Sequence, residues 1–250
     1  MIEQTKASDP KQPKPRKPIY LTVKEDLIRR VLSGEWRPGD LVPSEIALAE
    51  EYSVSVGTAR KAVEKLVQDN VVVRQRGRGT TIATYRGGKA AKPYKFLNFY
   101  SEQGERTERA TYLDFAEGTA TEFDAQQLDI AVGSPVSRVT RLRSAGGRPA
   151  IIEHIVVRGD FCPNAAERFA RLRPSSIASF FDRQYNLLIV RVDEKVYAAL
   201  GDQEDREHLG SAEGEPVLEV IRSAYDLGGF VIEYRLIHAR QGVYYTNTTR

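Results

Sequence analysis

Cationic side chains at short spacings are the residues of this chain best suited to bind anions. Arg60 and Lys61 are adjacent in a segment with helical periodicity, and Arg76 and Arg78 flank a glycine between two β-branched runs. A helix with cations on its polar face can contact the phosphates or base edges of DNA. A bare loop tip has no structural need for two arginines. These four residues therefore predict contact with nucleic acid, with solvated surface charge as the alternative for Arg60 and Lys61.

A second pair of cations, Arg141 and Arg143, is two residues apart in a strand-like segment. Residues two apart in a strand share a face, so both guanidinium groups point the same way. If that face lines a cleft, the pair can hold a carboxylate or a phosphate, and if it faces solvent, the arginines are ordinary surface cations. Spacing alone leaves both interpretations open.

Groups that serve catalysis or bind metals are sparse. The three histidines, His154, His208 and His238, are far apart in the chain, and no two have the spacing of metal ligands, so no metal site is predicted. The single cysteine, Cys162, excludes an intramolecular disulfide and a cysteine-based zinc site, and it is expected to be buried. No Ser/His/Asp arrangement can be argued. We therefore expect no catalytic residue and no cofactor.

Length and composition favour a folded protein with more than one partner. The chain has 250 residues, 41% hydrophobic and 28% charged, which suits one large or two ordinary domains. Up to Arg86 there are 16 Lys/Arg against 11 Asp/Glu, a net charge of +5, and beyond it 21 against 23, a net charge of −2. No apolar run approaches the ~20 residues that span a bilayer, and the N-terminus lacks the apolar core of a signal peptide. A cytoplasmic protein without a membrane partner is expected.

Three helices and a hairpin are expected to position the N-terminal cations. After a basic, Pro-rich tail at residues 1–18, apolar residues recur at helical spacing over 20–33. Ser44 and Ser55 are suited to cap a second and a third helix, which together form a helix-turn-helix. The runs 71–75 and 80–83 on either side of the basic turn form a hairpin. This order predicts a winged helix over residues 19–85, whose third helix enters the major groove.

The same segment resembles the DNA-binding domain of GntR-family bacterial transcription regulators. The resemblance rests on Pro43-Ser44-Glu45, on Ser55, Thr58 and Arg60, and on Gln75-Arg76-Gly77-Arg78-Gly79-Thr80. Ile46 and Val56 depart from the polar residues often found there, which shifts base contact toward Thr58, the Gly57 backbone, Arg60 and the wing. Ser55 and Thr58 can also serve only as a helix cap. The predicted DNA-binding residues are Ser44, Ser55, Gly57, Thr58, Arg60, Lys61, Arg76, Gly77 and Arg78.

An internal repeat organises the chain beyond a Gly- and Lys-containing connector at residues 86–94. The segment Gly133-Ser134-Pro135-Val136 recurs as Gly214-Glu215-Pro216-Val217, and a helix, a strand, a Gly-Gly turn and a strand recur with it about 80 residues later. We expect a pseudo-twofold antiparallel sheet with helices packed on one side over residues 95–250. The predicted fold class is α+β, with an N-terminal winged helix-turn-helix followed by this antiparallel-sheet domain.

Residues 95–245 carry a series of short motifs: Gly133-Ser134-Pro135-Val136, Arg141-Leu142-Arg143, Gly147-Arg148-Pro149, Ser175-Ser176-Ile177, Pro216-Val217-Leu218 and Ile232-Glu233-Tyr234. With these motifs the segment resembles the UTRA effector-binding domain of the HutC subfamily, which has a chorismate-lyase-like fold. The resemblance implies an effector pocket formed by Arg141, Arg143, Glu153, Ser176 and Glu233. Glu153 and Glu233 can instead be ion-pair partners of the arginines, and Ser176 can be only a helix cap.

The two resemblances together imply a dimeric one-component transcription regulator, most often a repressor in this subfamily. Each winged helix would read half of an inverted-repeat operator in double-stranded DNA. A small anionic metabolite in the C-terminal domain would modulate binding by favouring one arrangement of the two heads. Two alternatives stay open: a C-terminal domain with lyase-type activity on a carboxylate substrate, and a vestigial pocket in a domain that serves only dimerisation.

Overall fold

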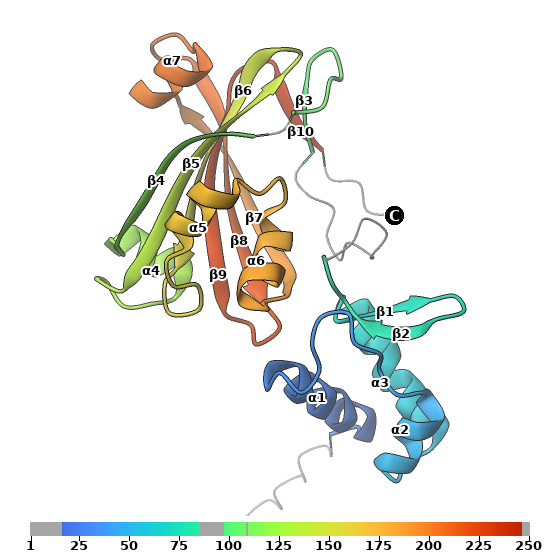
Figure 1. Ribbon diagram of the computed structural model, residues 1–250. Helices are drawn as coiled ribbons and strands as arrows, with labels where there is room; N and C mark the ends of the chain where they lie inside the picture. Colours follow the sequence, from blue (N-terminus) through green and yellow to red (C-terminus); the bar gives the residue numbers. More distant parts are fainter. Residues whose placement is uncertain (1–16, 86–97, 109, 247–250) are drawn as a thin grey trace, which may run out of the picture.

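The computed structural model describes residues 17–85, 98–108 and 110–246 (Figure 1). Apart from Lys17 and Pro18, the predicted tail at 1–18 lies outside the described residues, and so does the connector at 86–94. Three helices and a small hairpin form the N-terminal part, and a six-stranded sheet with four helices forms the larger part.

The N-terminal part is the predicted winged helix. Ser44 and Ser55 each cap a helix, since their Oγ atoms accept the backbone N–H of Ala47 and Thr58, both at 3.1 Å. The hairpin pairs Gln75 with Gly79, which leaves residues 76–78 at its tip. The elements are α1 (Ile19–Leu32), α2 (Glu45–Glu51), α3 (Val56–Gln68), β1 (Val72–Gln75) and β2 (Gly79–Ile82).

One apolar cluster holds these helices and the hairpin together. Leu27 of α1, Leu48 of α2 and Leu66 of α3 are almost completely buried in it, together with Ile82 of β2. Leu227, from the larger domain, packs against the same cluster. The core of the winged helix is therefore in direct contact with the second domain.

The larger domain is built on an antiparallel sheet with the strand order β4-β5-β6-β9-β8-β7. The repeated strand pairs β5–β6 and β8–β9 meet where β6 pairs with β9, so the expected pseudo-twofold axis runs through the middle of the sheet. A separate two-stranded sheet pairs β3 with β10. The strands are β3 (Asn98–Ser101), β4 (Thr111–Thr119), β5 (Pro135–Ala145), β6 (Arg148–Arg158), β7 (Ile189–Leu200), β8 (Pro216–Asp226), β9 (Val231–Ala239) and β10 (Val243–Thr246).

Helices cover both faces of the sheet, so the expectation of helices on one side is wrong. Val139 of β5 packs with Phe169 and Phe181 from α5 and α6, on what we call the inner face. Val136 lies on the opposite side of the same strand and packs with Leu128 of α4, on the outer face. The helix α7 also contacts the sheet, at β6. These helices are α4 (Glu122–Leu128), α5 (Ala165–Leu172), α6 (Ile177–Tyr185) and α7 (Gln203–Leu209).

None of the helices in the described segments combines the length and the apolar character that a membrane crossing requires. Cys162 is buried in the inner-face cluster, as expected, and burial raises the pKa of its thiol.

Candidate nucleic-acid interface and effector pocket

The first turn of α3 presents small polar groups to solvent. The Oγ of Ser55 lies 2.9 Å from Oγ1 of Thr58, in addition to accepting the Thr58 N–H. Ser55, Val56 and Gly57 are exposed, and a Cβ added at Gly57 would meet only the Ser55 Oγ, at 3.8 Å. The two hydroxyls thus cap the helix, while neither local space nor backbone strain requires glycine at position 57.

Glu45 at the start of α2 holds two arginines side by side. Its Oε2 accepts from Nε of Arg60 and its Oε1 accepts from Arg74, both at 2.8 Å. Arg60 keeps 57% of its side chain exposed, and the hydrogen bond with Glu45 raises its pKa. Arg74 was not among the residues predicted from the sequence. Its exposed position between the half-buried Val73 and Gln75 on β1 is the signal that could have indicated it.

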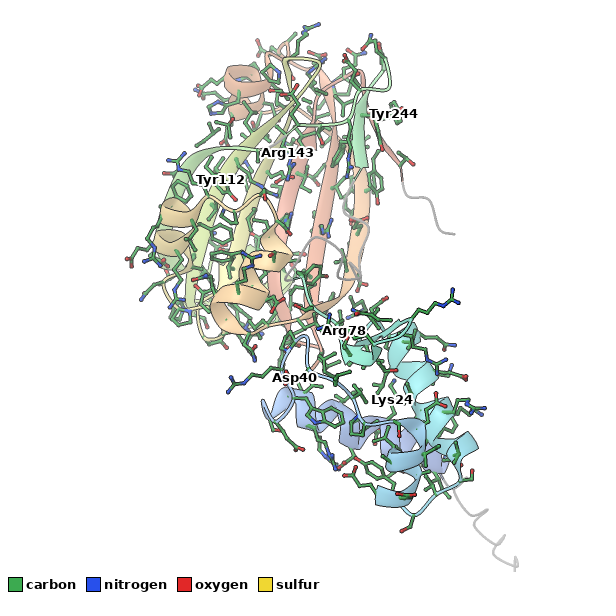
Figure 2. The ribbon with its side chains drawn as sticks, turned by 45° about the vertical axis from the view of Figure 1, so that its right-hand side comes forward. Lys24, Asp40, Arg78, Tyr112, Arg143 and Tyr244 are labelled. Atoms are coloured by element: carbon green, nitrogen blue, oxygen red, sulfur yellow. The ribbon has the colours of Figure 1, made fainter. Side chains whose placement is uncertain are left out.

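The remaining predicted cations of this domain differ in their surroundings. Lys61 lies over the ring of Tyr20, with its Nζ 4.4 Å from the ring centroid, so it rests on α1. Arg76 and Arg78 are exposed at the hairpin tip, where the Arg78 backbone N–H donates to the Gln75 oxygen at 3.0 Å, and neither guanidinium has a hydrogen bond or ion pair with another described residue. The turn between them needs Gly77, whose φ is +77°. Figure 2 labels Arg78 on this domain and Arg143 on the other, far from it.

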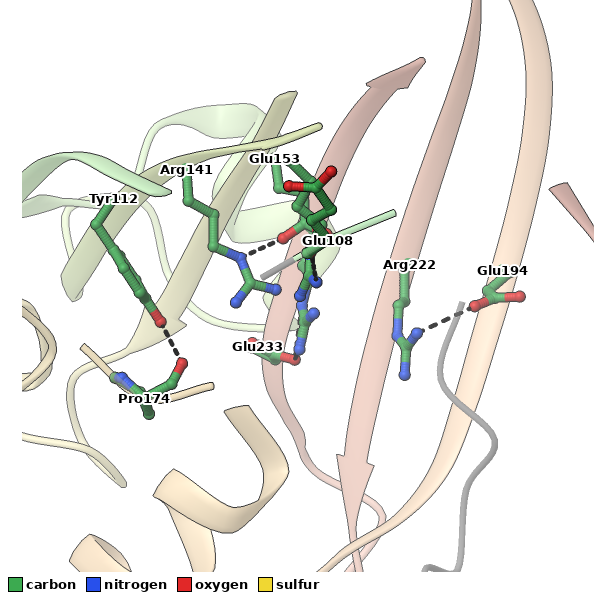
Figure 3. Close-up of polar contacts among 10 residues, drawn as sticks. Glu108, Tyr112, Arg141, Glu153, Pro174, Glu194, Arg222 and Glu233 are labelled. Carbon is green, nitrogen blue, oxygen red and sulfur yellow. Dashed lines mark hydrogen bonds and ion pairs between the residues drawn. The ribbon is translucent and has the colours of Figure 1, made fainter. Parts of the chain in front are cut away.

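Charged side chains form a band across the inner face of the large sheet. The register places Arg141 opposite Glu153 and Arg222 opposite both Arg235 and Glu194. Side chains opposite one another in a sheet share a face, so the band runs from β5 across β6, β9 and β8 to β7 (Figure 3). We call this set the charged band. It consists of Arg141, Arg143, Glu153, Glu194, Arg222, Glu233 and Arg235.

Glu153 is the centre of the charged band. Its carboxylate accepts from Nε of Arg141 and, at 3.2 Å, from Nε of Arg143, and Arg143 also donates to the backbone oxygen of Glu108 at 3.0 Å. Burial alone would raise the pKa of Glu153, but the charges of Arg141, Arg143 and Arg235 lower it to about 2. The predicted Arg141, Arg143 and Glu153 are therefore brought together, in the ion-paired arrangement that the sequence left open.

The other half of the band is less fully paired. Arg235 donates to Glu233, with its Nε 3.0 Å from Oε1, and Nη1 of Arg222 lies 3.4 Å from Oε1 of Glu194. Burial, together with the charge of Arg235, lowers the pKa of Arg222 to about 10. Three buried atoms of the charged band lack hydrogen-bond partners among the described residues: Nη1 of Arg141, Nε of Arg222 and Oε2 of Glu233.

Arg222 and Arg235 are site residues that sequence reasoning did not select. Arg222 corresponds to Arg141 in the internal repeat, and Arg235 shares a face with Glu233, so the sequence contained both signals. The band carries four arginines and three glutamates, an excess of one positive charge. Unpaired donors and excess positive charge in a buried site favour an anionic ligand.

Ser176 lies apart from these ion pairs. It caps α6, accepting the N–H of Ser179 at 3.3 Å, and lines a pocket of about 290 Å³ with Pro174, Phe180 and Arg183 among others. Tyr112 links this pocket to the charged band, because its hydroxyl donates to the Pro174 oxygen at 2.8 Å and its ring faces Arg141.

The helix that Ser176 caps also holds the end of the winged helix. Asp182, fully buried on α6, accepts from the Thr84 hydroxyl at 2.7 Å and from the Tyr85 backbone N–H at 2.9 Å. The Tyr85 hydroxyl donates to the backbone oxygen of Ile189 at 3.1 Å. A single helix thus connects the pocket at its N-terminus to the DNA-binding domain.

Comparison with known proteins assigns both parts of the chain. Residues 19–82 match the model of bacterial regulatory proteins of the gntR family, and residues 103–244 match the UTRA domain. The HTH-type transcriptional repressor NagR of Bacillus subtilis is 26% identical over 87% of this chain and 88% of its own length. The histidine utilization repressor of Pseudomonas putida is 28% identical, covering 88% of each chain.

A solved structure supports the fold of the larger part. The ligand-binding domain of a putative GntR-family transcriptional regulator from Bordetella bronchiseptica aligns with a TM-score of 0.56 at 23% identity. The match covers 63% of this chain and 99% of that one. The fold of the antiparallel-sheet domain is therefore also found in this solved structure.

Proposed function

The chain belongs to the gntR family of bacterial regulatory proteins that carry a UTRA domain, and from this membership we propose that it is a homodimeric repressor of an inverted-repeat operator. Relatives over most of the chain are named transcriptional repressors, which confirms the prediction of a DNA-binding regulator. The matched families and these relatives are regulators and not enzymes, so nothing supports the lyase alternative.

The DNA contacts that we propose begin at the α3 N-terminus and the wing. The fold has room for a side chain at position 57, so glycine is not required there for packing. Because Gly57 has no side chain, a base edge could approach the backbone of the first turn of α3. Arg60 and Arg74, aligned by Glu45, would reach phosphates beside that turn. The guanidinium groups of Arg76 and Arg78, which have no hydrogen bond or ion pair within the described chain, would contact the DNA backbone or the minor groove.

The observation that carries the effector half of the proposal is the charged band with its buried, unpaired donors. Nη1 of Arg141 and Nε of Arg222 would donate to a carboxylate or phosphate of the effector. Oε2 of Glu233, also unpaired, would accept from a hydroxyl, amide or amine of the same molecule. The expected effector is therefore a small metabolite that combines an anionic group with a hydrogen-bond donor.

Dimerisation is supported by an edge of the large sheet. Among the described residues, no strand pairs with the outer edge of β7, which exposes Val196, Tyr197 and Leu200, the last with 72% of its surface accessible. An exposed apolar edge strand is a liability unless another chain covers it. A twofold pair would match the symmetry of an inverted repeat. A protein that binds the bacterial chromosome works in the cytoplasm, the compartment that we propose.

The test is operator affinity measured against salt. The chain should protect a palindrome near its own gene, and log affinity should fall linearly with log salt concentration, because bound phosphates release counterions. A slope near zero, or no protected site, would reject DNA binding by this chain. A thermal-shift screen of sugar phosphates, amino acids and organic acids then identifies the effector as the compound that raises the melting temperature.

A further inference from the structure

The two copies of the internal repeat bury an aspartate at the same place on the outer face of the sheet. Asp124 is the third residue of α4 and Asp205 the third residue of α7. Each closes a capping box, with Thr121 in the first copy and Asp202 in the second. Both aspartates are almost completely inaccessible, so each needs compensation for its buried charge.

The first copy compensates its aspartate internally. Arg138 donates to Oδ1 of Asp124 at 3.1 Å and to Oδ2 at 2.6 Å, and the Tyr234 hydroxyl donates to Oδ1 at 2.6 Å. Burial would raise the pKa of Asp124, but these hydrogen bonds hold it well below its usual range. Both oxygens of this carboxylate are satisfied.

The second copy lacks the cation. The register pairs Arg138 with Val156 in the first copy and Glu219 with His238 in the second, so Glu219 stands in the place of the arginine and His238 in that of the valine. In the first copy, Tyr234 pairs with Val156 across the centre of the sheet, and in the second copy Ile152 pairs with His238. Ile152 therefore takes the place of Tyr234. A guanidinium and a hydroxyl are thus replaced by a carboxylate and an alkyl group.

The result is a cluster of acids around one imidazole. Oδ2 of Asp205 accepts the Asp202 N–H at 2.9 Å and lies 2.8 Å from Nδ1 of His238. Nε2 of His238 lies 3.2 Å from Oε2 of Glu219. One ligand atom each from Asp202, Asp205 and His238 lies within 4.8 Å of the others. Oδ1 of Asp205 is buried and has no hydrogen-bond partner within the described segments.

We propose that Asp202, Asp205 and His238 bind a divalent transition-metal cation such as Zn²⁺, with Glu219 as an adjacent carboxylate. Imidazole nitrogen and carboxylate oxygen are the ligand set that such ions take, whereas Mg²⁺ prefers oxygen ligands and retained water. The cation fills the role that Arg138 has in the first copy. It also gives the buried Oδ1 of Asp205 a partner.

Sequence spacing could not indicate this site, and the prediction of no metal rested on spacing. His238 is 33 residues from Asp205, and the pairing of β8 with β9 and the packing of α7 against the sheet bring them together. In Figure 1, α7 lies at the end of the sheet away from α1, α2 and α3. The site is therefore separate from the charged band, on the opposite face, and from the DNA-binding residues.

The experiment titrates Zn²⁺ into the full-length, tag-free protein after EDTA treatment and dialysis. Isothermal titration is expected to give one ion per chain with a Kd in the micromolar range or tighter, and Zn²⁺ should raise the melting temperature by mass action. Asp202→Asn keeps the helix cap and should weaken binding by about 10-fold or more, as should Glu219→Gln. Both side chains reach solvent, so these variants are expected to fold.

Asp124→Asn is the control in the first copy, because Asp124 is the equivalent of the proposed ligand Asp205 but is already paired with Arg138. It should leave Zn²⁺ affinity and stoichiometry unchanged. His154→Gln removes the neighbouring imidazole, which lies 3.3 Å from Glu204, and should also bind as the unmodified chain does. Absence of saturable binding to the unmodified chain, or binding by Asp202→Asn, His238→Gln and Glu219→Gln equal to that of the unmodified chain, would overturn the proposal.

Discussion

The wing tip and the charged band use arginine under opposite conditions. The guanidinium groups of Arg76 and Arg78 are exposed and have no partner in the described chain, whereas Arg141, Arg222 and Arg235 are at most 5% exposed and each forms an ion pair with a glutamate. An unpaired cation in water has little cost in free energy, so an exposed arginine needs no partner within the fold and is available to bind DNA phosphates. In the sheet an unpaired cation would be costly, so the protein supplies carboxylates and leaves only a few donors for a ligand.

Removal of Arg141 should have the largest effect on stability, because it removes a buried ion pair of the charged band. Arg141→Met would leave the buried Glu153 with one direct partner, Arg143, and should lower the free energy of unfolding by about 3–5 kcal/mol. Urea unfolding measures the change. Arg143→Met is the control: its side chain is 21% exposed, so a smaller loss is expected. Equal losses of unfolding free energy in the two variants would contradict the argument that the more deeply buried arginine contributes more to stability.

The charged band should also make stability depend on acid pH. The pKa of Glu153 is lowered from 4.5 to about 2 in the folded chain, so its contribution is complete above pH 4.5 and is lost as the pH falls toward 2. That contribution is about 3 kcal/mol. Unfolding free energies measured across this range should show the loss, and Glu153→Gln should flatten it.

The contact between the winged helix and α6 should contribute an intermediate amount to stability. Asp182→Ala removes the acceptor of two hydrogen bonds, from the Thr84 hydroxyl and the Tyr85 N–H, and should lower the free energy of unfolding by about 1–3 kcal/mol. Limited proteolysis should then cut faster near residue 85. Ser179→Ala removes only a 3.5 Å contact to the Tyr85 oxygen and serves as the control. Unchanged proteolysis in Asp182→Ala would mean that this contact does not hold the domains.

The wing should show the smallest effect on stability. Arg76→Ala with Arg78→Ala should change the unfolding free energy by less than about 0.5 kcal/mol. Affinity for double-stranded DNA should fall, and the salt slope should decrease by about 1 for each phosphate contact removed. Fluorescence anisotropy at several salt concentrations measures both. A large loss of stability would show that the two arginines have partners in the fold.

Local features of the fold were predictable from the sequence. Ser44 and Ser55 begin helices because their side chains accept orphan N–H groups, and this depends only on residues two or three positions away. Gly77 and Gly79 both have a positive φ, as a tight basic turn requires. The order of the three helices and the hairpin in the N-terminal part was therefore predictable from the sequence.

Contacts between distant segments were predicted less well. Val136 and Val139 show alternation along β5, but nothing local says that helices cover both sides. Arg74 owes its place to Glu45, 29 residues away, and that contact depends on packing between α2 and the hairpin. Arg222 was visible as a repeat of Arg141, yet its burial follows from the sheet register.

The contact of Leu227 with the winged-helix core, together with the burial of Ala83 and Tyr85 against Ala178 and Leu188, bears on how the protein can be divided. A fragment that stops at residue 85 would expose this apolar surface to water. Such a truncated DNA-binding head should self-associate or precipitate at concentrations where the intact chain does not, and polar substitutions at Ala83 and Tyr85 should restore its solubility.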